Sequence, residues 1–154
     1  MKILMVCLGN ICRSPLAQGI LEQKIMQAGL DWEVDSCGTG GWHAGEKPDN
    51  RSIAIAKKYG IDISKQRARK VRSTDFGNFD LIFAMDSQNY QDLIHQCVSE
   101  DERQKIKLIL NELYPEKNIA VPDPYYGGED GFESVYQMLN AACDKIIENY
   151  NKNS

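Results

Sequence analysis

The chain has 154 residues, of which 42% are hydrophobic and 26% charged, and its formal net charge is −4. This length is typical of one domain, so we expect a single domain over residues 1–154 whose core needs no metal or disulfide. The negative charge argues against a nucleic-acid partner, and no apolar run approaches the ~20 residues of a membrane-spanning helix.

Strands and helices are predicted to alternate along the chain. The first strand is expected at residues 3–6, followed by a helix that Ser14 caps, Pro15 opens and Gly29 ends. Further strands are expected at 32–37, 81–84 and 106–110, helices at 50–59, 86–97 and 132–147, and a loop over 118–131. The fourth strand segment fits a helix nearly as well. This alternation predicts a parallel sheet with helices on both faces and a ligand site at the carboxyl ends of the strands.

The usage of cysteine and histidine bears on the compartment and on metals. Five cysteines lie at scattered positions, and the apolar stretch at residues 1–6 is too short for a secretory signal. Free thiols in a reducing compartment are therefore expected, which favours the cytoplasm. The two histidines, His43 and His95, are interpreted as surface or hydrogen-bonded residues. Without more histidines or a C-x-x-C pair, no metal site is predicted.

The pattern C-x5-R occurs twice, and the two copies differ. The second copy, Cys97 to Arg103, contains no glycine and carries three acidic residues that would repel an anion. We interpret it as a coincidence and Cys97 as an ordinary thiol. The first copy, in the segment CLGNICRS at residues 7–14, lies between a strand and a helix N-terminus, where backbone N–H groups converge on an anion.

The first copy has the parts of a phosphate cradle with a nucleophile. Gly9 allows the loop to curl, and Arg13 can bind two phosphate oxygens. Cys7 lies at the bottom of this cradle, where the thiolate is favoured, with the Ser14 hydroxyl and the loop amides as hydrogen-bond donors. A buried cysteine at a strand end is the alternative interpretation.

Attack on phosphorus also needs an acid for the leaving group. Asp123 is a candidate because Pro122 and Pro124 hold it stiffly and the adjacent Tyr125 and Tyr126 offer aromatic walls. A simple turn aspartate between prolines is the alternative.

With both segments in view, the sequence resembles the low-molecular-weight protein tyrosine phosphatases along nearly its whole length. The matching segments are 6–15, 35–36, 68–69, 79–80, 84–86 with Asn89, and 123–127. The resemblance implies a doubly wound, Rossmann-like α/β fold: a four-stranded parallel sheet, helices on both faces, and a phosphate-binding loop between strand 1 and helix 1. It also implies hydrolysis of phosphotyrosine in proteins, and of small aryl phosphates, without cofactor or metal.

The resemblance assigns roles to individual residues. Cys7 is the nucleophile that forms a cysteinyl-phosphate, Arg13 binds the phosphoryl group, and Asp123 is the general acid and then the base. Asn10 would order the loop through its side chain, and Ser14 would stabilise the thiolate. The expected substrate-binding residues are Leu8, Gly9, Asn10, Ile11, Cys12, Ser14, Trp42, Tyr125 and Tyr126.

Some positions depart from the family pattern or stay open. Gln66 or Arg67 replaces a histidine that many relatives carry near the loop serine, and Cys37 replaces an alanine. Cys12 either forms a reversible disulfide with Cys7 or packs as a small hydrophobe under the loop. Whether Cys37 joins such a disulfide, and whether the two tyrosines are phosphorylated, stays open.

Two rival functions and a basic segment complete the expectations. A thiol-linked arsenate reductase shares the fold but needs two further cysteines close together after the third strand, where Cys97 stands alone. A non-catalytic phosphate-binding module would need neither Cys7 nor Asp123. Five of the eight residues at 65–72 are basic; we interpret them as a solvated face, with guidance of acidic phosphopeptides as the second reading. A monomer without nucleic-acid or membrane partners is expected.

Overall fold

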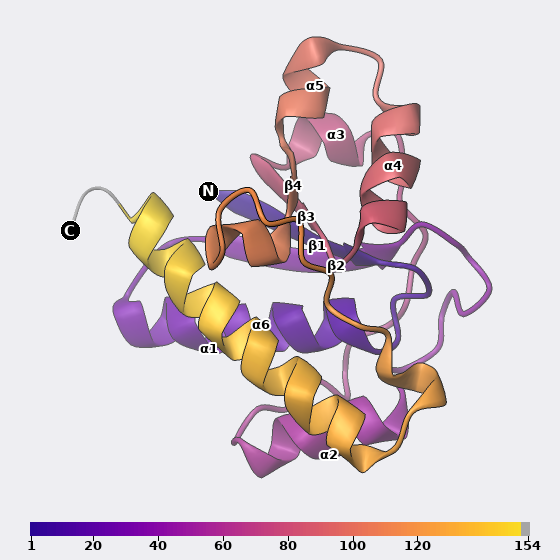
Figure 1. Ribbon diagram of the computed structural model, residues 1–154, viewed down its shortest axis with the longest axis vertical. Helices are drawn as coiled ribbons and strands as arrows, with labels where there is room; N and C mark the ends of the chain where they lie inside the picture. The colour runs from indigo at the N-terminus through magenta and orange to yellow at the C-terminus, as the bar shows by residue number, and fades with distance from the viewer. Residues whose placement is uncertain (152–154) are drawn as a thin grey trace.

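A four-stranded parallel sheet lies at the centre of the computed structural model, which describes residues 1–151 (Figure 1). Its strands are β1 (Lys2–Cys7), β2 (Glu33–Gly38), β3 (Leu81–Ala84) and β4 (Ile106–Leu108), in the order β2-β1-β3-β4. All three pairings are parallel. The predicted doubly wound α/β fold is confirmed.

Helices cover both faces of the sheet (Figure 1). One face carries α1 (Arg13–Ala28), α2 (Asn50–Lys58) and α6 (Glu129–Tyr150), and the other carries α3 (Asp75–Asn78), α4 (Ser87–Gln96) and α5 (Glu100–Gln104). Two short 3-10 helices, η1 (Ile109–Glu112) and η2 (Pro124–Tyr126), follow β4. Within residues 1–151 no helix has the length and apolar character that crossing a membrane requires.

The interior strand β1 separates two hydrophobic cores. Ile3 and Met5 point into the core formed with α1 and α6, whereas Leu4 and Val6 point into the core on the opposite face. All four side chains are fully buried, as expected for a central parallel strand, which is apolar on both faces. This packing fixes the carboxyl end of β1, where Cys7 lies.

Most boundaries lie within one residue of the sequence prediction, and three predicted elements differ by more or in the role of a residue. The strand predicted at 106–110 ends at Leu108, and the chain continues as η1. Helix α6 begins at Glu129, inside the predicted loop. The prediction that Ser14 caps α1 was wrong, because the helix begins at Arg13 and Ser14 lies buried in its first turn. The Ser14 hydroxyl contacts the Cys7 sulfur instead.

Gly19 allows α1 to pack closely against the segment that follows α2. A Cβ at this position would lie 2.5 Å from Cγ2 of Ile63 and 3.0 Å from Cγ2 of Ile61. Glycine in an exposed helix is less favourable than alanine by about 0.5–1 kcal/mol, but overpacking a core costs about 1–3 kcal/mol. We therefore expect Gly19→Ala to lower the free energy of unfolding, as measured by urea denaturation, by about 1–2 kcal/mol.

Gly77 provides the matched control for this stability prediction. It lies in α3, and nothing is within 4 Å of a Cβ added there. Gly77→Ala should leave stability unchanged or slightly raised. Equal effects of the two substitutions would show that the contacts with Ile61 and Ile63 do not decide whether alanine at position 19 raises or lowers the free energy of unfolding.

Candidate active site

The candidate site lies at the carboxyl ends of β1 and β3. The helices that follow these strands, α1 and α4, lie on opposite faces of the sheet. β1 is flanked by β2 and β3, and the carboxyl ends of neighbouring strands at such a switch point frame a crevice. The loop after β1 packs closely against the end of β2. A Cβ at Gly38 would lie 2.7 Å from the Leu8 carbonyl oxygen and 2.9 Å from that of Gly40. Only glycine therefore fits at position 38.

Asn10 orders the loop between β1 and α1. Its backbone has a φ of 58°, in the left-handed region that residues other than glycine seldom adopt. Three side-chain hydrogen bonds hold it there. Nδ2 donates to Ser14 Oγ at 2.8 Å and to Ser36 Oγ at 3.0 Å, and Oδ1 accepts from the Arg69 backbone N–H at 3.0 Å. Asn10 thus ties the loop to α1, to β2 and to the segment around Arg69.

The Cys7 sulfur contacts the hydroxyl group of Ser14, which also has two other polar contacts. Ser14 Oγ is 3.0 Å from Cys7 Sγ, accepts a hydrogen bond from Asn10, and lies 3.4 Å from the Cys37 carbonyl oxygen. Because the Asn10 amide donates to Ser14, the serine proton is free for the sulfur or for the longer contact to that carbonyl. Donation to sulfur stabilises the thiolate.

Arg13 is buried and held on one side. It is 2% exposed, and its Nη1 donates to Asp86 Oδ2 and to the Val121 carbonyl oxygen, both at 2.8 Å. Nη1 carries two hydrogens, so these bonds occupy it fully. Nε and Nη2 remain as the parallel donors that match two oxygens of a phosphate.

Two carboxylates lie near Arg13, and only one faces the cleft. Asp86 uses both oxygens, Oδ2 for Arg13 and Oδ1 for the Asn89 N–H at 2.8 Å. Asp123 Oδ1 accepts from the Tyr125 N–H at 3.1 Å, while its Oδ2 lies 3.7 Å from Arg13 Nη2. Asp123 therefore keeps an oxygen available for proton transfer.

A cleft of about 270 Å³ collects most of the predicted site residues. The two others, Asn10 and Ser14, are buried and do not line it. Trp42 and Tyr126 form an exposed rim, with exposed fractions of 72% and 91%. The residues that line the cleft are Cys7, Leu8, Gly9, Ile11, Cys12, Arg13, Trp42, His43, Asp123, Tyr125 and Tyr126.

Sequence reasoning missed two residues of the site. His43 pairs with Glu46 at 3.0 Å, as a satisfied histidine should, but it also lines the cleft. Its ring occupies the space beside Gly9, where a Cβ would lie 3.0 Å from His43 Cδ2. The neighbouring Trp42 was the available signal. The second is Asp86, which follows a buried strand at the edge of the sheet where ligands bind.

The departures from the family pattern do not reach the sulfur directly. Gln66 Nε2 donates to the Pro15 carbonyl oxygen at 3.0 Å, and Arg67 donates to the Ser64 and Gln66 carbonyl oxygens. Ser14 is supported instead by Asn10 and the Cys37 carbonyl group. The Cys37 thiol is fully buried, and this burial raises its pKa above the ordinary value.

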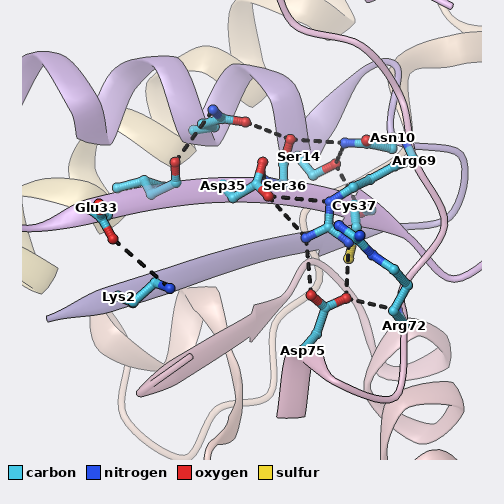
Figure 2. Close-up of polar contacts among 12 residues, drawn as sticks. Lys2, Asn10, Ser14, Glu33, Asp35, Ser36, Cys37, Arg69, Arg72 and Asp75 are labelled. Carbon is cyan, nitrogen blue, oxygen red and sulfur yellow. Dashed lines mark hydrogen bonds and ion pairs between the residues drawn. The ribbon is translucent and has the colours of Figure 1, made fainter. Parts of the chain in front are cut away.

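The basic segment at 65–72 is only partly a solvated face. Figure 2 shows the Arg69 guanidinium between Asp35 and Asp75. Its nitrogen atoms lie 2.9 Å from a carboxylate oxygen of each. Burial alone would lower the pKa of Arg69, but hydrogen bonds to these carboxylates outweigh it and raise the pKa. Arg69 is thus a structural link between β2 and α3. Among the described residues, no three His, Cys, Asp or Glu side chains are grouped to hold a metal ion.

Comparison with known proteins gives the family. The family model described as "Low molecular weight phosphotyrosine protein phosphatase" matches residues 2–154. The chain belongs to this family. A low molecular weight phosphotyrosine protein phosphatase from Schizosaccharomyces pombe is 45% identical over 141 residues, which cover 90% of this chain and 89% of that protein. The resemblance noted from the sequence is confirmed.

Two solved structures extend this low-molecular-weight phosphatase assignment to the fold. A protein tyrosine phosphatase from Entamoeba histolytica, crystallised with Hepes in the active site, matches with a TM-score of 0.93 and 41% identity, covering 99% of this chain and 98% of that chain. A Drosophila arginine phosphatase matches with a TM-score of 0.92 and 32% identity, covering 100% of both chains. The chain is therefore an enzyme of the low-molecular-weight phosphatase family.

Proposed function

We propose that the protein hydrolyses phosphotyrosine in proteins, and small aryl phosphates, through a cysteinyl-phosphate on Cys7. The observation that carries this proposal is the convergence of Cys7, Arg13 and Asp123 on one cleft. A nucleophile, a cation for phosphate oxygens and a carboxyl group are the three parts that the two-step hydrolysis of a phosphate monoester needs.

In the first step the Cys7 thiolate attacks phosphorus in line with the leaving oxygen. The sulfur–phosphorus bond forms as the bond from phosphorus to the phenolic oxygen breaks, and Asp123 gives its proton to that oxygen. The free Nε and Nη2 donors of Arg13 bind the equatorial oxygens, where negative charge is spread in the transition state. The phenol leaves.

In the second step water attacks the cysteinyl-phosphate. The ionised Asp123 takes a proton from this water, the sulfur–phosphorus bond breaks, and inorganic phosphate forms. Cys7 departs as a thiolate, which a hydrogen bond from the Ser14 hydroxyl 3.0 Å away stabilises. The acid of the first step is thereby regenerated.

The rim of the cleft favours an aromatic leaving group. Trp42, Tyr125 and Tyr126 line it, and the two tyrosine rings lie edge to face with centroids 4.9 Å apart. Flat aromatic walls pack against a phenyl ring in offset or edge-to-face geometry. The rim therefore supports phosphotyrosine rather than the shorter phosphoserine as the substrate class.

The test is hydrolysis by the reduced protein of 4-nitrophenyl phosphate and of a phosphotyrosyl peptide, with and without EDTA. We expect turnover of both that EDTA does not change, because Arg13 supplies the positive charge at phosphorus. A reduced, folded protein that hydrolyses neither would overturn the proposal. Arsenate reduction coupled to thioredoxin would then be the next assay.

Phosphoarginine is the second candidate substrate, since one structural match at 32% identity is an arginine phosphatase. The same assay distinguishes it when a phosphoarginyl peptide of matched sequence is included. The aromatic rim leads us to expect a higher kcat/KM for the phosphotyrosyl peptide. The reverse order would reassign the substrate class but keep the site.

We also propose that Cys7 and Cys12, which line the same cleft, form a reversible disulfide. The Cys7 thiolate attacks hydrogen peroxide and releases hydroxide, giving a sulfenic acid. The Cys12 sulfur then displaces the sulfenic hydroxyl group as water.

Alkylation with iodoacetamide tests the state of these two thiols. Burial, together with the charge of Asp49, raises the pKa of Cys12 to about 12. Its thiol therefore stays protonated at pH 7 and becomes reactive only as the pH approaches that value. We expect peptide mass spectrometry to find the reduced protein modified at Cys7 and not at Cys12. Peroxide-treated protein should resist modification until dithiothreitol is added, and equal labelling of both cysteines at pH 7 would contradict this.

We further propose that the protein is a monomer of one domain that works in the cytoplasm. Its five cysteines are free thiols, as a reducing compartment maintains them. Phosphoproteins are the proposed partners, and the net charge of −4 offers nothing to nucleic acid. Light scattering after size exclusion tests the oligomeric state.

A further inference from the structure

The first turn of α2 is bonded to the loop that carries the nucleophile. The Asp49 backbone N–H donates to the Ile11 carbonyl oxygen at 2.8 Å. The hydroxyl of Ser52, which is fully buried, donates to the Cys12 carbonyl oxygen at 2.9 Å. The beginning of this helix therefore has a fixed position relative to the Cys7 loop.

Arg51, in the same turn, reaches the loop that carries the acid. Its Nη2 donates to the Tyr125 carbonyl oxygen at 2.9 Å, and its Nη1 lies 3.3 Å from the Gly127 carbonyl oxygen. Nε and Nη2 also donate to the two carboxylate oxygens of Asp49, at 3.0 and 3.1 Å. Four N–H donors of one guanidinium are thus engaged, which fixes its plane.

Two aromatic rings lie near the same guanidinium. The Arg51 Cζ lies 4.8 Å from the ring centroid of Phe132 and 5.5 Å from that of Tyr125. Phe132 is buried in α6, so one ring is anchored and the other lines the cleft. Arg51 therefore lies near the ring of Tyr125 and also bonds to its backbone.

After Asp123 the acid loop is anchored by the buried Pro124 and by few hydrogen bonds to other segments. Before it, Val121 is buried and bonded through its N–H to the Met85 carbonyl oxygen. After it, the Tyr125 N–H bonds to Asp123 itself, and the Gly127 N–H bonds to the Pro124 carbonyl oxygen. Among the side chains that the structure describes, that of Arg51 ties the carbonyl groups of residues 124–128 to the rest of the protein, through Tyr125 and Gly127.

We propose that Arg51 is a positioning residue that links the nucleophile loop to the acid loop and so aligns Asp123 with the leaving group. The path runs from Ile11 through Asp49 and Arg51 to the backbone of Tyr125, two residues after the acid. This inference rests on the proposed function, because the acid that Arg51 positions is the acid of that reaction. Arg51 itself does not line the cleft that Cys7, Arg13 and Asp123 share.

The experiment measures kcat/KM of Arg51→Met for aryl phosphates whose leaving groups differ in basicity. A nitrophenolate leaves readily without a proton, whereas phenolate depends on the acid. General acids contribute about 10²–10⁴-fold, and misalignment forfeits part of this, so we expect an about tenfold loss for phenyl phosphate. For 4-nitrophenyl phosphate the loss should stay within about twofold.

Two further variants make the test specific. Lys58→Met is the control, because it removes another cation of α2. Lys58 forms an ion pair with Glu133 of α6 at 2.6 Å, but it does not bond to the acid loop. This variant should leave the whole series unchanged. In the Asp123→Asn background, Arg51→Met should add no further loss, because residues acting through one group are not additive.

The outcomes separate this inference from the proposed function. An equal loss for both substrates, an additive loss in the Asp123→Asn background, or no loss at all would overturn the role of Arg51 while wild-type turnover upholds the function. If Arg51→Met does not fold, Arg51→Lys keeps the charge but lacks the planar fork, and the same dependence on leaving group is expected of it. Wild-type inactivity would instead overturn the function itself.

Discussion

Cys7→Ser is expected to abolish turnover of aryl phosphates, lowering kcat by more than about 10⁴-fold, because a serine hydroxyl at this position is not ionised near neutral pH. The oxygen replaces the sulfur with little change of shape, and the remaining cradle is unaltered. Asn10 still orders the loop, and Arg13 still offers Nε and Nη2 to an oxyanion. Inorganic phosphate should therefore bind Cys7→Ser, as isothermal titration calorimetry can measure.

The control for this prediction is the second C-x5-R segment. Cys97→Ser removes the thiol that donates to the Leu93 carbonyl oxygen in α4 and does not line the cleft. Full activity is expected of it. Residual turnover by Cys7→Ser would mean that the nucleophile lies elsewhere, and a loss in Cys97→Ser alone would reverse the interpretation of the two segments.

The sheet and its main helices could be predicted because their signals are local. The strand that ends at Cys7 is a short run of apolar residues, fully buried on both faces between two layers of helices. Helices α3 and α5 could not be predicted this way. They have four and five residues, little more than one turn, and so show no helical periodicity.

The same distinction between local and distant contacts applies to the site. The loop from Cys7 to Ser14 is contiguous, so its composition and spacing indicate an anion cradle directly. The role of Ser14 was predicted in part: its contact with the sulfur was expected from the loop residues and also from the resemblance, whereas the expected helix cap was wrong. The Ser14 hydroxyl contacts the Cys7 sulfur instead of capping the N-terminus of α1. Only the conformation of the folded loop decides between these two partners.

Residues that support the loop from a distance carry no such signal. Asp86 lies 73 positions after Arg13, and the Arg69 backbone bonds to Asn10 across 59 positions. Either residue alone resembles an ordinary surface charge in the sequence. Asp86 reaches Arg13 because β1 and β3 are parallel and end at one edge of the sheet. Arg69 reaches Asn10 because the segment after α2 runs beside Gly38 at the end of β2.

Asp123→Asn is expected to lower kcat/KM for phenyl phosphate by about 10²–10³-fold, because the amide has no proton of suitable acidity to give to the leaving oxygen. The amide oxygen can still accept the hydrogen bond from the Tyr125 N–H, so the start of η2 should keep its geometry. The loss should shrink as the leaving group becomes less basic, until 4-nitrophenyl phosphate is only slightly affected.

Charge and chemistry can be told apart in this variant. Asp123 Oδ2 lies 3.7 Å from Arg13 Nη2, so replacing it by asparagine also removes a negative charge that competes with phosphate. Phosphate should therefore bind Asp123→Asn at least as tightly as wild type while turnover falls. Asp130→Asn removes an exposed carboxylate outside the cleft and should change neither quantity. A loss that is equal for all leaving groups would show that Asp123 organises the cleft without giving a proton, and the acid would have to be sought elsewhere.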